Sequence, residues 1–194
     1  PQTLDSLFPS DSTRQRYSLG HGRFYLNSTH RTDSIRLNYS TSLDFYHVSN
    51  LYRTRENTFR LKSNLNKFTD LFAGEFLGVN ASLDVLDFSS DSLNMGLGWI
   101  TDVNPYMRLG RKNWDVELGA ALVFGNSDSS FFKIYPRIQA NWKIFKQYVQ
   151  LFGGVAGDFE RFTFRELYTQ NPFIQSNVSL TNQNTPYRLH AGIK

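Results

Sequence analysis

Two acidic residues, Asp115 and Glu117, stand two positions apart in the stretch NWDVELGAALVFGN at 113–126. Paired carboxylates on one face can carry out general acid–base catalysis. The next alternating stretch carries three cations of matching parity: Lys133, Arg137 and Lys143. Because opposite charges on neighbouring strands form cross-strand ion pairs, a salt-bridge ladder explains these residues more simply. We therefore predict a ladder between the two stretches and no catalytic pair.

Charged residues elsewhere in the chain also fall on one parity of an alternating pattern. Apolar side chains occupy the other parity, which is the pattern of a strand with one buried face. We predict that ten of these charges share the polar face of a sheet: Arg36, Asp44, Arg60, Lys62, Asp84, Asp115, Glu117, Lys133, Arg137 and Lys143.

The four histidines, His21, His30, His47 and His190, have no metal-ligand spacing, and the chain has no cysteine. Neither a metal site nor a cofactor is therefore expected. His47 has the parity of the apolar face of its strand. Some outer-membrane lipid hydrolases use a serine–histidine pair on their lipid-facing surface. No nucleophile partner can be picked out, so no catalytic residue is assigned and the chain is expected not to be an enzyme. A lipid-acting barrel enzyme is the weakest of the alternatives.

Alternation of period two predicts the strands that would position these residues. They cover 17–27, 33–48, 58–66, 76–88, 93–103, 113–126, 132–145, 148–160 and 187–194. Consecutive strands with short linkers favour hairpins. We predict an all-β fold, an antiparallel meander of about 8–10 strands across 17–194, after an extended lead-in or loop at 1–16. Pro136, inside one stretch, predicts a bulge or a broken strand.

The predicted linkers alternate in length, and alternate linkers of a meander emerge at opposite ends. The shorter set is 29–33, 67–71, 109–113 and 146–147, and the longer set is 48–57, 88–92, 125–130 and 162–186. One end should therefore have tight turns and the other longer loops. Loops 48–57 and 162–186 are the expected contacts for a small solute or a surface partner.

Strand length and aromatic content bear on what the apolar face meets. Several stretches reach 11–16 residues, whereas ordinary strands have about 5–6, and about ten tilted residues span the apolar band of an outer-membrane barrel. Six apolar-face aromatics are expected at the membrane interfaces: Tyr39, Phe45, Trp99, Trp114, Phe124 and Trp142. These features favour a transmembrane β-barrel with a polar lumen. A soluble β-sandwich or small β-barrel ligand-binding module remains the alternative.

The charge of the chain argues against one class of partner. Lysines and arginines are scattered, and the formal net charge is only +4. A nucleic-acid surface would show clustered cations. No nucleic-acid partner is expected.

The last quarter of the chain, YVQLFGGVAGDFE…ELYTQNPF…TPYRLHAGIK, resembles barrel segments of Gram-negative outer-membrane proteins described as TonB-dependent-receptor-like. The matching residues are Leu151–Gly157, Asn171–Phe173 and Ala191–Lys194. The resemblance implies location in the bacterial outer membrane, contact with its lipid, and a role in uptake, transport or at the surface. Because single-chain bacterial barrels have even strand numbers, a count of about nine predicts an incomplete barrel.

Overall fold

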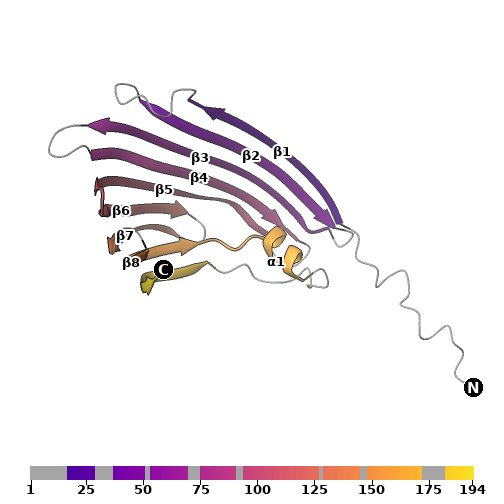
Figure 1. Cartoon of the computed structure of the whole chain (residues 1–194). Helices are drawn as coiled ribbons and strands as arrows, with labels where there is room; N and C mark the ends of the chain where they lie inside the picture. The colour runs from indigo at the N-terminus through magenta and orange to yellow at the C-terminus, as the bar shows by residue number, and fades with distance from the viewer. Residues whose placement is uncertain are drawn as a thin grey trace, which may run out of the picture.

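Nine antiparallel strands form one sheet in sequential order, and this confirms the predicted all-β meander (Figure 1). The computed structural model describes residues 17–28, 37–50, 53–69, 75–90, 94–126, 129–144, 148–171 and 182–194. The sheet is not closed into a barrel, because β1 and β9 are its two edges. The predicted lead-in at 1–16 and the candidate Arg36 lie outside the described residues.

The strands are longer than those of ordinary globular sheets. They are β1 (Tyr17–Asn27), β2 (Asn38–Asn50), β3 (Arg55–Thr69), β4 (Glu75–Ser89), β5 (Asn94–Arg111), β6 (Trp114–Asn126), β7 (Ser130–Ile144), β8 (Val149–Glu160) and β9 (Gln183–Ile193). One short helix, α1 (Phe164–Gln170), follows β8. Within the described ranges, no helix is long and apolar enough to cross a membrane.

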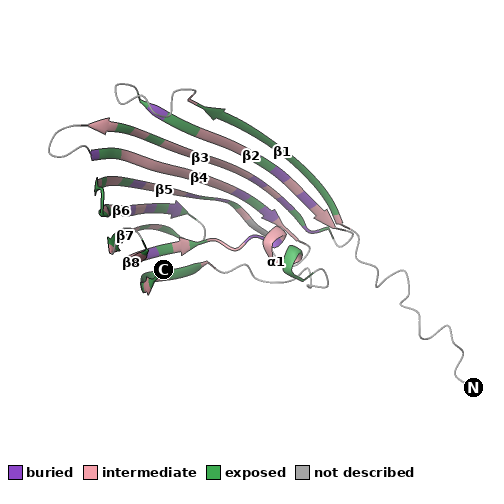
Figure 2. Cartoon of the chain, viewed as in Figure 1, coloured by how far each residue is buried: buried purple, intermediate pink, exposed green. Residues whose placement is uncertain are grey.

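Residues of one parity form each face of the sheet, since neighbouring strands stay in register over most of their length. We call the face that contacts α1 the inner face, because Tyr46, Val48, Leu86 and Phe88 on that face pack with Phe164. The opposite parity forms the outer face. Figure 2 shows buried positions gathered on the strands beside α1, whereas β1 is exposed along almost its whole length.

Among the described residues, most outer-face side chains in the middle of the sheet are apolar and exposed or half-buried. Leu118 is 39% exposed, Trp142 58% and Ile134 61%. Across β2–β7, charged residues of outer parity lie only near strand ends: Arg55, Lys67, Glu75, Asp87 and Arg111. A central apolar band therefore crosses these six strands, with polar residues on both sides of it.

Pro136 does not break its strand. β7 pairs with β6 from Ser130 to Trp142, but its pairing with β8 covers only Arg137–Ile144. Proline has no N–H to donate to a ladder. The missing donor therefore stands where β8 separates from β7.

The predicted difference in loop length between the two ends is wrong. Linkers at the end that carries α1 are 51–54, 90–93, 127–129 and 161–182, and those at the other end are 28–37, 70–74, 112–113 and 145–148. Segment 48–57 is mostly strand, because β2 runs to Asn50 and β3 begins at Arg55. Only 161–182 is a long linker at the predicted end.

Candidate functional site

Every described residue predicted for the polar face lies on the inner face. The registers of the paired strands from β2 to β8 place these residues on that face: Asp44, Arg60, Lys62, Asp84, Asp115, Glu117, Lys133, Arg137 and Lys143. The six predicted interface aromatics, Tyr39, Phe45, Trp99, Trp114, Phe124 and Trp142, all have outer parity. Phe45 lies in the middle of β2, so its place along the strand is not that of an interfacial residue.

Four inner-face charges of alternating sign align across β1–β4: Arg23, Asp44, Arg60 and Asp84. We call this row the charge ladder. Arg23 Nε donates to Asp44 Oδ1, and Arg60 Nε donates to Asp84 Oδ1. The Asp44 side chain is only 10% exposed, and His21 Nε2 lies 3.3 Å from its Oδ1. Each carboxylate on this row is therefore paired with a cation on the adjacent strand.

The predicted ladder between β6 and β7 is wrong in its partners. The register places Asp115 opposite Asn141 and Glu117 opposite Gln139. Asp115 Oδ2 accepts from Asn141 Nδ2 at 3.0 Å and from Arg108 Nη2 of β5 at 3.3 Å. Parity was predicted correctly, but parity does not determine which residues face each other across a pair of strands.

The predicted cations of β7 have other neighbours. Arg137 Nη2 lies 3.9 Å from Asp102 Oδ2 on β5, which is two strands away. The Lys133 ammonium lies over the rings of Phe131 and Phe159, at 5.6 and 4.6 Å from their centroids. A cation over an aromatic face is stabilised by the ring quadrupole.

After β8 leaves β7, the chain crosses the inner face, and we call residues 157–171 the inner strap. A Cβ on Gly157 would lie 2.6 Å from Tyr135 Cδ1, so only glycine allows this close approach. The Phe159 ring lies 4.7 Å from that of Phe131, and Arg161 Nη1 donates to the carbonyl of Gly98 at 3.2 Å. The strap therefore passes from β7 over β5 towards α1.

The helix of the strap begins at a capping box. The Glu166 backbone N–H donates to Thr163 Oγ1 at 3.3 Å, and the Thr163 N–H donates to Glu166 Oε2 at 3.2 Å. Phe164, only 1% exposed, packs among Tyr46, Val48, Leu86 and Phe88. Sequence reasoning missed this helix, although Thr-x-x-Glu is a recognisable start signal.

Glu56 joins the strap to the sheet. Its side chain is fully buried, and its carboxylate accepts from the backbone N–H of Phe164 at 2.5 Å and of Arg165 at 3.3 Å. Glu56 lies beyond the apolar band, because the next outer-face residue, Asn57, belongs to a polar row with His47 and Asp87. Burial raises the pKa of Glu56 to about 7, since desolvation outweighs these two hydrogen bonds.

We expect attachment of the strap to weaken as pH rises. A carboxyl with a raised pKa binds its proton more tightly in the folded chain, so this stability is complete below the unfolded value of 4.5 and lost as pH rises through about 7. At about 1.4 kcal/mol per pKa unit, the effect is on the order of 3 kcal/mol. A nitroxide at Gln170→Cys, on the exposed end of α1, should gain mobility between pH 5.5 and 8.5.

The matched control is Glu56→Gln, which keeps the size of the side chain and cannot ionise. The other charged groups beside Glu56 on the strap are Arg165 and Glu166, and both stay in this variant. Mobility at Gln170→Cys should then be the same at both pH values. A response to pH that persists in Glu56→Gln would assign the effect to another group.

The predicted solute loops contact each other in their described parts. Glu56 lies in segment 48–57, whereas Phe164 and Arg165 lie in segment 162–186. The Arg165 guanidinium also lies 4.4 Å from the Tyr46 ring centroid. These two segments therefore carry a contact between the strap and the inner face, and neither is a free outward loop over these residues.

His47, the histidine considered as a catalytic candidate, lies on the outer face near the end of β2. His47 Nδ1 and Asn57 Oδ1 are 2.7 Å apart, and Asn57 Nδ2 donates to Asp87 Oδ2 at 3.4 Å. These contacts form a polar row across β2–β4.

No family model, no curated protein and no solved structure matches this chain. The function of the chain must therefore be inferred from the geometry of its two faces.

Proposed function

We propose that this sheet forms part of the wall of a bacterial outer-membrane β-barrel whose inner face lines a polar lumen. The observation that carries the proposal is the uncovered apolar band of the outer face, with its charges confined to strand ends. A charge on the lipid face costs about 2–4 kcal/mol at the membrane midplane, whereas lumen charges are tolerated. The proposed role is transport, uptake or a surface function, and it includes no catalytic step.

The directions of the edge strands support a wall that further strands complete. In a meander of nine strands, β1 and β9 run the same way. Pairing β1 directly with β9 would make a parallel ladder. Pairing β9 with β1 of a second copy, related by an axis along the membrane normal, would also make a parallel ladder. An all-antiparallel barrel therefore needs an odd number of further strands. The resemblance to TonB-dependent-receptor-like barrels supports uptake as the mode of transport.

Labels on β6 test which face meets lipid. The chain has no cysteine, so Leu118→Cys and Glu117→Cys each provide one labelling site, on adjacent residues of opposite face. We expect a nitroxide at Leu118→Cys to collide with dissolved oxygen, which concentrates in lipid. A nitroxide at Glu117→Cys should collide mainly with a water-soluble nickel chelate, with the oxygen-to-nickel ratio at least several-fold lower.

Detergent dependence provides the control for these labels. A folded monomer in plain buffer, with Leu118→Cys and Leu122→Cys inaccessible to thiol reagents, would overturn the proposal. That result would favour a soluble β module in which the apolar side chains meet in a core. A lipid-facing Leu118 in a sample that hydrolyses phospholipid would instead revive the enzyme alternative.

A further inference from the structure

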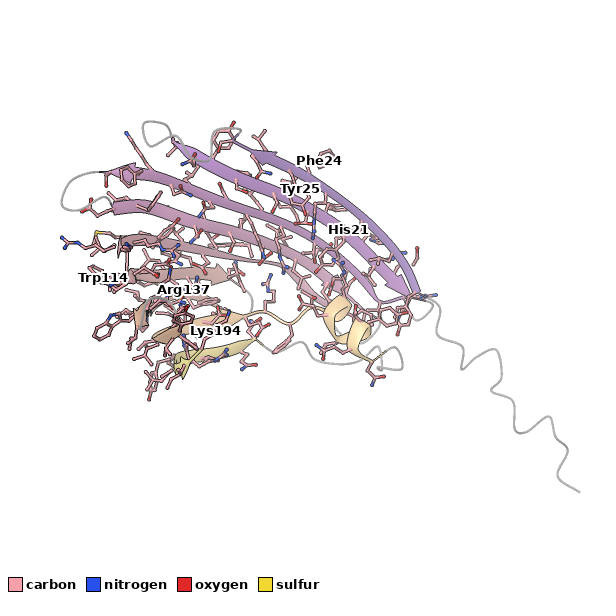
Figure 3. The ribbon with its side chains drawn as sticks, viewed as in Figure 1. His21, Phe24, Tyr25, Trp114, Arg137 and Lys194 are labelled. Atoms are coloured by element: carbon pink, nitrogen blue, oxygen red, sulfur yellow. The ribbon has the colours of Figure 1, made fainter. Side chains whose placement is uncertain are left out.

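A polar hollow lies on the inner face, midway along the strands. Its volume is ≈360 Å³, near the lower end of the range of about 300–1,000 Å³ for small-molecule pockets. Its walls come from β1–β5 and β7, and they include Tyr25, Lys62, Asn80, Asp102 and Arg137. Tyr25 and Arg137, labelled in Figure 3, belong to the first and last of these strands.

Two adjacent rows of polar side chains, most of them uncharged, run across the inner face at the hollow. One row is Asn27, Ser40, Asn64, Asn80 and Asn104, and the other is Tyr25, Ser42, Lys62, Ser82 and Asp102. Amides and hydroxyls offer both donors and acceptors. A solute that fits these rows must itself donate and accept at several neighbouring positions.

The amides are held in place by one another and by a tyrosine. Asn64 Nδ2 donates to Asn80 Oδ1 at 2.5 Å, and it lies 3.3 Å from the Tyr106 hydroxyl. The Tyr106 side chain lies over Gly78, where an added Cβ would clash with the ring. This glycine lets Tyr106 lie against the sheet, so the amide row is preorganised before a solute arrives.

Most charges around the hollow are already paired, which limits the charge of the solute. The charge ladder lies along one side of it. On the other side, Arg137 Nη2 is 3.9 Å from Asp102 Oδ2. In the amide orientation that satisfies both of its polar atoms, Asn104 accepts from Arg137 Nη1 at 2.8 Å and donates to the Ala120 carbonyl at 3.2 Å. Lys62 is exposed and supplies a donor at low desolvation cost.

We propose that this hollow binds an uncharged, hydroxyl-rich solute of about one or two sugar rings. Sugar hydroxyls both donate and accept hydrogen bonds, and this matches the mixture of donors and acceptors along the two rows. The exposed ring of Tyr25 at the edge of the hollow offers a face for the apolar side of such a ring. The inference rests on the proposed function, because it takes the inner face to be the path of a solute.

Saturation-transfer difference NMR on the full chain in detergent tests the proposal, with maltose as the probe. Maltose should receive saturation from the protein, and Asn80→Leu should weaken its affinity at least tenfold. The matched control, Gln139→Leu, makes the same kind of change on the inner face of β7 outside the hollow. It should leave maltose binding unchanged.

Three results would overturn this inference: no transfer to maltose, equal loss in both variants, or stronger binding of glucuronate than of maltose. The labels at Leu118→Cys and Glu117→Cys are read on the same preparation. Lipid contact at Leu118→Cys without maltose binding removes the solute site and leaves the barrel wall. Maltose binding without lipid contact removes the barrel wall and leaves a sugar site on a soluble sheet.

Discussion

Replacing Phe164 with Ala is expected to detach the inner strap while the sheet stays folded. Phe164 is 1% exposed and fills the space over Tyr46, Val48, Leu86 and Phe88. Truncating a buried phenylalanine to alanine costs about 3–5 kcal/mol. Because each 1.4 kcal/mol is a factor of ten, exchange of the amide hydrogens at 164–166 should become at least about a hundredfold faster. Hydrogen-exchange mass spectrometry of the folded chain measures this change.

Phe124→Ala is the matched control, since Phe124 lies on the outer face of β6 and is 38% exposed. It should leave exchange at 164–166 unchanged. The β-sheet signal in circular dichroism should persist in both variants. Unchanged protection in Phe164→Ala would show that another contact holds the strap. Loss of the sheet together with the strap would show that the two unfold as one unit.

The strands could be predicted from sequence because parity needs no knowledge of the partner strand. Alternation gave both the antiparallel meander and the face of every described candidate. Strand ends were harder to predict. Val48 and Glu56 lie in a segment that was predicted to be a loop, but both are buried beneath α1. A strap from elsewhere in the chain covers them, and no local pattern shows such cover.

Cross-strand partners could not be predicted, because register depends on where each turn falls. The cations of β7 were paired with Asp115 and Glu117, whereas the register gives them other neighbours. The ladder that forms, in β1–β4, includes Arg23, which is not among the ten charges predicted for the polar face. The helix was missed for another reason. Its seven residues are too few to show periodicity, although the Thr163–Glu166 capping signal was present.

Removing one cation from the charge ladder is expected to destabilise the sheet. Replacing Arg60 with Met is expected to reduce the free energy of unfolding by about 2–3 kcal/mol, because it leaves a partly buried carboxylate unpaired. The side chains of Arg60 and Asp84 are only 26% and 23% exposed, so water replaces the lost partner poorly. Asp44 lies opposite position 60 on the adjacent strand, so its negative charge repels that of Asp84 once Arg60 is removed. Urea unfolding in detergent, followed by circular dichroism, measures the change.

A second substitution separates the cost of an unpaired charge from the loss of side-chain packing. In Arg60→Met with Asp84→Leu, no charge is left unpaired, and stability should return to within about 1 kcal/mol of the original chain. Arg108→Met is the control, since its pair with Asp115 is more exposed, at 52% and 27%, and should cost at most about 1 kcal/mol. If the double variant is no more stable than Arg60→Met alone, the ladder stabilises the wall through packing. Equal losses in Arg60→Met and Arg108→Met would remove the special role of the ladder.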